Sequence, residues 1–172
     1  IDGDGWNNLS EVEGYRLQQV LSSEVIRREA IVPFPDLPVS VGLIAGDVQP
    51  LLGGNPVGAR TARELYALPQ VEVASHTHTH PYHWEFFSHY DRAREERMVK
   101  AYLPPEQPIR ERISAALMKT AGKTYFNSRY DSYVAGSDEL PRTYLRDPFN
   151  LALEVTGALR FAEQLAPPGK KA

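Results

Sequence analysis

The stretch Val71–Trp84 reads VEVASHTHTHPYHW, a short apolar run followed at once by closely spaced histidines. Val71–Ser75 is short and rich in valine, which predicts a β-strand. His76 and His80 are four residues apart, so on one helical turn or a turn-like loop their side chains point the same way. Two neutral imidazoles on one face are a natural pair of ligands for a divalent metal.

Predicted helices and strands alternate along the chain before this stretch. Ile1–Gly5 is interpreted as the end of a first strand, and Val39–Gly46 is a short, apolar, β-branched run that predicts a second. Helices are predicted over Gly14–Ala30 and Ala59–Leu68. In the first helix, the apolar residues at helical spacing are Leu17, Val20, Leu21, Val25 and Ile26. This order predicts an α/β fold, with a parallel sheet or barrel covered by helices.

The pattern loosens in residues 85–146. Charged helical segments are predicted over Tyr90–Tyr102 and Pro108–Gly122, and the alternating signs of DRAREER suggest a solvated face. A last helix is predicted from an Asp147 cap with Pro148 at the first position, ending near Gln164. Twelve of the seventeen aromatic residues lie between positions 82 and 149. These rings either pack a subdomain or line a sugar-binding groove.

The composition limits the classes of function. The chain has 172 residues, of which 42% are hydrophobic and 24% charged, which is typical of a soluble globular domain. The net charge of −3 gives no electrostatic case for nucleic acid or an anionic membrane. There is no cysteine and no apolar run long enough for a membrane span. The start at Ile1, without an initiator methionine or signal peptide, suggests a processed or excised fragment.

An oxygen donor for the histidine pair is expected from Ile1–Gly5, whose sequence is IDGDG. Asp2 and Asp4 alternate on an extended chain, and the glycines between them allow close approach of the backbone to a ligand. Because ligands bind at the carboxyl ends of strands in α/β sheets and barrels, both segments can place their side chains at the same end of the sheet or barrel. The result is a site of two histidines and one carboxylate, with a spare carboxylate beside it as a candidate general base.

Other interpretations of these residues remain open. The histidines could form an adventitious metal patch. His78 should face away from the pair and is interpreted as structural, whereas His83 and Trp84 are predicted to line a substrate groove. The N-terminal residues also match part of an EF-hand calcium loop, with Asn7 at the place of the usual apolar residue. In that alignment, loop positions three, five, six and twelve are Asp2, Asp4, Gly5 and Glu11.

Three segments together resemble a known family. IDGDG at Ile1–Gly5 and EVASHTHTHP at Glu72–Pro81 resemble the first two motifs of the NodB-homology polysaccharide deacetylases, carbohydrate esterase family 4. The Asp-Gly-Asp form is closest to the branch that processes the Pel exopolysaccharide. Leu151–Lys171 resembles the helix and third motif of that branch. The resemblance covers residues 1–84 and 147–171.

The resemblance implies a fold and a set of roles. The fold is a distorted (β/α) barrel, incomplete in this chain, as a single domain over 1–172 with an insertion at about 85–146. The cofactor is a divalent metal, most often zinc, which nickel or cobalt can replace. The implied roles are Asp2 as general base and Asp4, His76 and His80 as metal ligands. Thr77 would support the loop by hydrogen bonding.

The resemblance also has gaps. Ala166 appears at the place of an arginine that orients the base, and the histidine that serves as general acid is expected after Ala172. The implied function is removal of N-acetyl groups from the amino sugars of an exopolysaccharide, in the periplasm or outside the cell, as in biofilm formation. The alternative is a catalytically weak carbohydrate-binding or scaffold domain that keeps the metal loop. The oligomeric state is left open.

Overall fold

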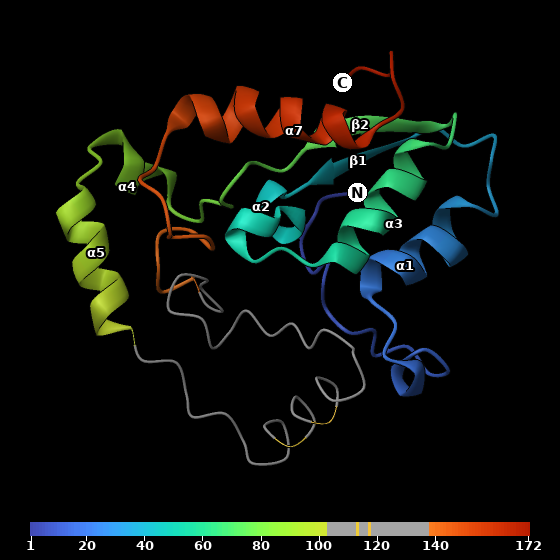
Figure 1. Ribbon diagram of the computed structural model, residues 1–172, viewed down its shortest axis with the longest axis horizontal. Helices are drawn as coiled ribbons and strands as arrows, with labels where there is room; N and C mark the ends of the chain where they lie inside the picture. The colour runs from blue at the N-terminus through green and yellow to red at the C-terminus, as the bar shows by residue number, and fades with distance from the viewer. Residues whose placement is uncertain (103–112, 114–116, 118–137) are drawn as a thin grey trace. The chain divides into compact units, whose positions relative to one another are not determined.

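The computed structural model describes residues 1–102, 113, 117 and 138–172. The chain divides into two compact units, of which the first is Ile1–His80 with Asn150–Ala172 and the second is Pro81–Phe149 (Figure 1). We predicted one domain with an insertion at about 85–146, and this stays a prediction; the second unit includes that range, with slightly wider bounds. Apart from Ile113 and Leu117, the helix predicted over Pro108–Gly122 lies outside the described residues.

The sheet of the first unit has two parallel strands, β1 (Val39–Leu43) and β2 (Val71–Ser75). The predicted bounds of β2 are confirmed. The predicted strand at 39–46 ends earlier, at Leu43, because α2 (Ala45–Val48) begins two residues later. The α/β class is therefore confirmed, whereas no closed barrel is present among the described residues.

Ile1 extends this sheet on the side of β1 that faces away from β2. Its amino group donates to the Ser40 carbonyl at 2.9 Å, and its carbonyl accepts from the Gly42 N–H at 2.8 Å. One residue bonded to both neighbours of its partner is the pattern of parallel pairing. Asp2 and Asp4 therefore follow a residue that pairs in parallel with β1, in the predicted direction. The strand predicted over Ile1–Gly5 is limited to this pairing of Ile1, because the chain turns from Asp4 onward.

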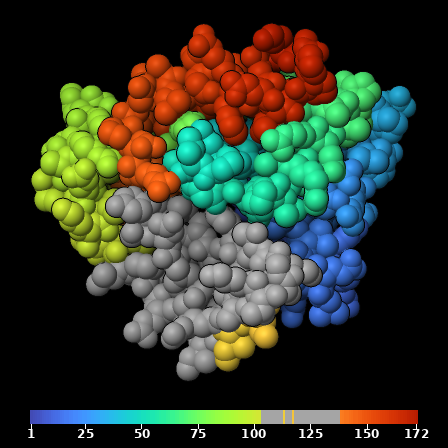
Figure 2. Space-filling view, in the orientation of Figure 1, coloured from blue at the N-terminus to red at the C-terminus, as the bar shows by residue number. Residues whose placement is uncertain are grey.

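Two helices pack against the hydrophobic face of the sheet. These are α3 (Pro56–Tyr66) and α7 (Ala158–Leu165), which contact β2 and each other (Figure 1), and their surfaces adjoin in Figure 2. The buried core between them and the strands consists mainly of Val41, Leu43, Leu65, Tyr66, Val71, Val73 and Ala162. Ser40 and Glu72 lie exposed on the opposite face. In the described part of the chain, α3 and α7 thus cover the face of the sheet that carries Val41, Leu43, Val71 and Val73.

The caps of these helices differ from the predicted ones. The Asn55 side chain accepts from the Val57 N–H at 2.9 Å, so α3 begins at Pro56 and not at Ala59. The last helix begins at Leu151 and contains the π-helical segment η5 (Leu153–Gly157). It is capped by Asn150, whose side chain accepts from the Leu153 N–H at 3.2 Å. The prediction that Asp147 caps this helix was wrong.

The helix predicted from Gly14 begins later. The structure has a short 3-10 helix, η1 (Arg16–Gln18), then α1 (Ser22–Ile26) and the π-helical segment η2 (Arg27–Ile31). Leu17, predicted on the buried face, is 92% exposed. The reason is backbone pairing around an antiparallel bridge between Leu9 and Leu21, because the Val20 carbonyl and the Ser22 N–H bond to the neighbours of Leu9. These groups are unavailable to a helix.

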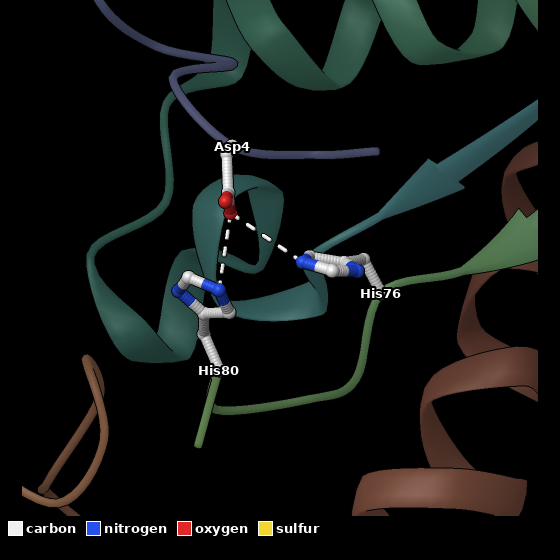
Figure 3. Close-up of side chains that lie close together, drawn as sticks. All are labelled: Asp4, His76 and His80. Carbon is white, nitrogen blue, oxygen red and sulfur yellow. Dashed lines mark ion pairs between the residues drawn. The ribbon is translucent and has the colours of Figure 1, made fainter. Parts of the chain in front are cut away.

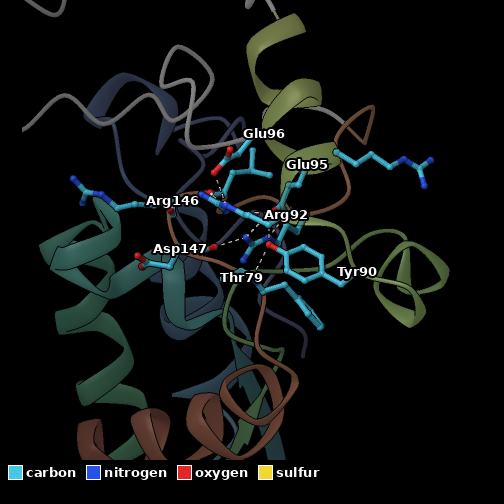
Figure 4. A network of polar contacts seen from close by, with 12 residues as sticks. Thr79, Tyr90, Arg92, Glu95, Glu96, Arg146 and Asp147 are labelled. Carbon is cyan, nitrogen blue, oxygen red and sulfur yellow. Dashed lines mark hydrogen bonds and ion pairs between the residues drawn. The ribbon is translucent and has the colours of Figure 1, made fainter.

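The second unit contains α4 (Trp84–Ser88) and α5 (Arg92–Ala101). DRAREER was predicted to form a solvated face, but Glu95 within it is 0% exposed. Its carboxylate pairs with the equally buried Arg142, at 2.7 Å from Nε, and accepts from Arg92 and from the Tyr90 hydroxyl (Figure 4). The charged run therefore supplies the polar centre of this unit.

Several aromatic residues of the second unit pack against one another. Phe87 and Phe149 are stacked with ring centroids 4.0 Å apart, and Tyr90 and Phe86 lie at the edge of this pair. The interpretation that the aromatic residues pack a subdomain is confirmed for these rings. In the described part of the chain, no helix has the length and apolar character to cross a membrane.

The first prediction concerns Glu24 of α1, which forms ion pairs with Arg27 and Arg28 of η2. The hydrogen bond from Arg27 is the main cause that lowers the pKa of Glu24 to about 2, from an ordinary value of 4.5. Because the folded-state pKa is depressed, the charged carboxylate stabilises the fold above pH 4.5, and this stability is lost as the pH falls towards 2. Glu24→Gln should lower the free energy of unfolding at pH 7 by about 1–2 kcal/mol in urea denaturation.

The control is Glu64→Gln, since Glu64 also approaches Arg27, at 3.3 Å, but is 44% exposed. That change should cost at most a few tenths of a kcal/mol. A Glu24→Gln protein as stable as the parent at pH 7, or one whose deficit persists unchanged near pH 2, would contradict the assignment.

Candidate metal centre

Asp4, His76 and His80 converge at the carboxyl end of the sheet (Figure 3). Asp4 Oδ1 lies 3.4 Å from His76 Nε2 and 3.0 Å from His80 Nε2. The side chain of His80 is 17% exposed, whereas those of His76 and Asp4 are 36% and 57% exposed. The three ligands that the sequence predicted are thus together, and all three side chains are at least partly accessible to solvent.

The separations suit a divalent metal. Donor atoms around a tetrahedral zinc ion with bonds of 2.0–2.1 Å lie about 3.3 Å apart. The two measured N–O distances lie on either side of that value, and the three candidate ligand atoms are all within 4.8 Å of one another. Two imidazoles and a carboxylate are also the donor types that zinc, cobalt and nickel accept.

The loop that carries Asp4 depends on a glycine at position 3. A Cβ at Gly3 would lie 2.8 Å from the Ile44 backbone nitrogen and 2.9 Å from the Gly42 carbonyl oxygen. Only glycine permits this close approach to the end of β1. Gly5 then adopts a φ of +73°, which also favours glycine. The sequence IDGDG therefore fixes the backbone on both sides of Asp4.

Trp6 and Asn7 anchor the far side of the same loop. Trp6 is 3% exposed, and its indole N–H donates to the Gly58 carbonyl at 3.1 Å. The Asn7 side chain donates to the Asp47 carbonyl at 2.7 Å. Residues that follow Asp4 are thus bound to α3 and α2, which holds the carboxylate near the end of the sheet.

The histidine loop is anchored to the β1–α2 connection. The His76 N–H donates to the Leu43 carbonyl at 2.9 Å, which extends the strand pairing by one bond. The Ala45 and Gly46 N–H groups, at the start of α2, donate to the carbonyls of the next two loop residues at 3.1 and 2.9 Å. The first half of the loop is therefore bonded to the neighbouring element.

Thr77 and His80 have φ angles of 71° and 55°, an uncommon conformation for residues with a side chain. The Thr77 hydroxyl accepts from the His80 N–H at 3.1 Å, which is the supporting role that the resemblance implied. The two histidines thus lie on a turn-like loop and not on a helical turn. Their ring centroids are 5.1 Å apart.

Burial lowers the pKa of His80, and the positive charge of a protonated His76 would act in the same direction. The nearby carboxylates of Asp4, Asp2 and Glu154 oppose this effect. The balance favours the neutral imidazole, which is the form that binds metal.

Glu154 is a contributor that sequence reasoning missed. It is 1% exposed, and its carboxylate accepts from the backbone N–H groups of His78 and Thr79. The available signal was a single acid within the largely apolar run LALEVTGALRF. His78 itself is 7% exposed, in agreement with its predicted structural role.

Asp2 is exposed and is not part of the three-residue grouping. Its predicted role as general base stays a prediction. The EF-hand interpretation fails, because Glu11 does not join the candidate ligands among the described residues. The residues that follow Glu11 form turns and a three-residue 3-10 helix in place of an exit helix.

Three other predicted positions, His83, Trp84 and Ala166, are not part of the three-residue grouping. His83 and Trp84 belong to the second unit, where His83 Nε2 lies 2.7 Å from the Asp138 carbonyl oxygen, and their role in substrate binding stays a prediction. Ala166 packs against the core of the first unit just before Lys170, whose ammonium donates to carbonyls preceding β2. This is the opposite end of β2 from the histidines, so Ala166 does not fit the place of an arginine that orients Asp2.

Comparisons of the chain with protein-family models, with curated proteins and with solved structures found no match. The metal centre therefore rests on the geometry of its three side chains and on the loops that hold them. The deacetylase interpretation rests on the resemblance of the motifs.

The first prediction for this site is that Zn²⁺ and Co²⁺ bind through the three residues. Asp4→Asn, His76→Ala and His80→Ala should each weaken binding by more than about 100-fold in isothermal titration calorimetry, because each removes a ligand. His89→Ala is the matched control, since His89 is an exposed histidine of the second unit. Unchanged affinity in the three ligand variants would rule out this centre.

The second prediction concerns Gly3→Ala, which forces backbone atoms apart and displaces Asp4. Metal affinity should fall at least about 10-fold. In the control Gly14→Ala, a φ of +89° makes the change strained, but nothing lies within 4 Å of the added carbon. The control should lose stability and keep the parent affinity. Parent affinity in Gly3→Ala would show that the tight approach does not position the carboxylate.

Proposed function

We propose that this chain carries the metal centre of a hydrolase that removes N-acetyl groups from the amino sugars of an exopolysaccharide. The observation that carries the proposal is the convergence of Asp4, His76 and His80, with the exposed Asp2 two residues from a ligand. This combination provides three protein ligands and a carboxylate outside the ligand set. Catalytic zinc sites commonly have three protein ligands and keep one position for water or substrate.

Asp4, His76 and His80 would hold the metal. A divalent cation there supplies Lewis acidity, which polarises an amide carbonyl and lowers the pKa of water to about 7. Asp4 contributes a negative charge that partly neutralises the cation, and the two histidines contribute neutral nitrogen donors. The exposure of Asp4 and His76 leaves one side of the site open to a substrate.

Asp2 is proposed as the general base. Its side chain is exposed, so water can reach the carboxylate. Asp2 lies two residues before the ligand Asp4, and Gly3 between them packs closely against the end of β1. It would accept a proton from the attacking water as the acetyl carbon is attacked. The C–N bond then breaks, the amine nitrogen gains a proton, and the products are acetate and a free amino sugar.

The substrate class is supported by the motifs and not by a contact. The order of IDGDG and SHTHTH resembles the first two motifs of the NodB-homology deacetylases. The positions of Asp4, His76 and His80 are compatible with the metal site that this resemblance implies. Zinc is the proposed metal, and the periplasm or the extracellular space is the proposed location. The second candidate, a carbohydrate-binding or scaffold domain with weak catalysis, has no observation of its own in its favour.

The test is acetate release from a β-1,4-linked N-acetylglucosamine oligomer by the zinc- or cobalt-loaded protein. Asp2→Asn should lower turnover by about 10²–10⁴-fold, because the general base is removed. It should leave metal affinity within about threefold of the parent value, since Asp2 is not a ligand. Asp4→Asn should lose metal affinity first, and excess metal should partly restore its turnover.

Two results would count against this division of roles. Equal losses of metal affinity in Asp2→Asn and Asp4→Asn would make Asp2 a ligand. Tight metal binding by the parent protein without acetate release would favour the scaffold alternative over the hydrolase.

A further inference from the structure

We infer that Glu154 is a positioning residue that sets the place of His80 relative to His76, an inference that rests on the proposed metal centre. Glu154 lies 1% exposed in η5, far along the chain from the histidine loop. It contacts the loop through the backbone and the Thr79 hydroxyl and not through either imidazole.

The contacts of Glu154 are concentrated on the middle of the loop. Its Oε2 accepts from the His78 N–H at 2.9 Å and from the Thr79 N–H at 2.8 Å. Its Oε1 accepts from the Thr79 hydroxyl. Hydrogen bonds to a carboxylate are among the strong ones, and loss of this acceptor would leave two buried N–H groups without their partner.

The loop needs support of this kind because of its backbone. Thr77 and His80, on either side of the two contacted residues, both adopt positive φ. Such conformations persist only where surrounding contacts fix them. The N–H groups of Ala45 and Gly46 hold the loop carbonyls of residues 77 and 78, and Glu154 holds the N–H groups of residues 78 and 79.

The two sets of hydrogen bonds hold different parts of the histidine loop. His76 directly follows β2, and its N–H is bonded to Leu43, so the sheet fixes its position. His80 lies at the far end, beyond the residues that Glu154 holds. Removal of Glu154 should therefore displace His80 more than His76.

The segment that carries Glu154 supports this role independently. Leu153–Gly157 is π-helical, although it lies within a longer helical run. A π turn inside an α-helix is uncommon and often occurs at functional sites. Here the π-helical segment holds Glu154, the acid that bonds to the histidine loop.

The test compares substitutions that separate the hydrogen bonds from the charge. Glu154→Ala removes the acceptor and should weaken Zn²⁺ and Co²⁺ binding by about 10–100-fold. Glu154→Gln keeps an oxygen for the two N–H groups and should stay within about threefold of the parent. Glu154→Asp keeps the charge but withdraws the oxygens by one methylene, so it should resemble the alanine variant.

The readouts are the metal dissociation constant and the visible absorption spectrum of the Co²⁺-loaded protein, which reports ligand number and geometry. The melting temperature of each metal-free variant is measured alongside. Glu95→Ala is the matched control, because it removes an equally buried carboxylate from the second unit. It should lower stability while the dissociation constant and the cobalt spectrum remain those of the parent.

Each outcome bears on a different claim. Parent affinity and spectrum in Glu154→Ala, or in Glu154→Asp if the alanine variant does not fold, would overturn the positioning role. An equal loss in the glutamine and alanine variants would also overturn it, since charge alone would then matter. Failure of the parent protein to bind metal would instead refute the metal centre, and metal binding without acetate release would refute only the proposed hydrolase function.

Discussion

Parallel pairing along β1 is the constraint on which the rest of the structure depends. Ile1 bonds to one edge of β1, and β2 pairs along the other. Because all three segments run in the same direction, their carboxyl ends meet at one edge of the sheet. Asp4 and His76 are therefore neighbours despite their separation in the chain. An antiparallel arrangement of either neighbour would send its polar residues to the opposite edge.

The loops beyond the strands convert this proximity into a site. Gly3 brings the Asp4 loop against the backbone of Ile44, and Trp6 is buried against α3. The histidine loop has two residues with positive φ and takes hydrogen bonds from α2. Both loops are thus held by contacts that do not use the Asp4 and His76 side chains, and these two side chains stay partly exposed to solvent.

Two buried carboxylates show how local sequence can mislead. Glu95 belongs to a run of charges that is typical of a solvated helix face, yet it is buried against Arg142. Glu154 belongs to an apolar run and is buried against backbone N–H groups. In both cases, the partner comes from a distant segment, so neither burial nor contact could be inferred from the spacing of nearby residues. Satisfied hydrogen bonds are what permit each charge to be buried.

The sequence by itself determined the α/β class and the bounds of β2, and strand patterns and strand direction placed the Asp2–Asp4 segment near His76 and His80. The choice of Asp4 as the ligand came from the resemblance of the motifs. The close packing of Gly3 against the backbone of Ile44 and Gly42 was decided by the tertiary structure. Tertiary structure alone decided where α1 begins, since pairing between Leu9 and Leu21 withdraws backbone groups from the predicted helix. It also decided that Glu154 holds the histidine loop. The physical reason is that hydrogen bonds between distant segments outweigh the local helix propensity of each segment. Such bonds cannot be inferred from the spacing of residues along one segment.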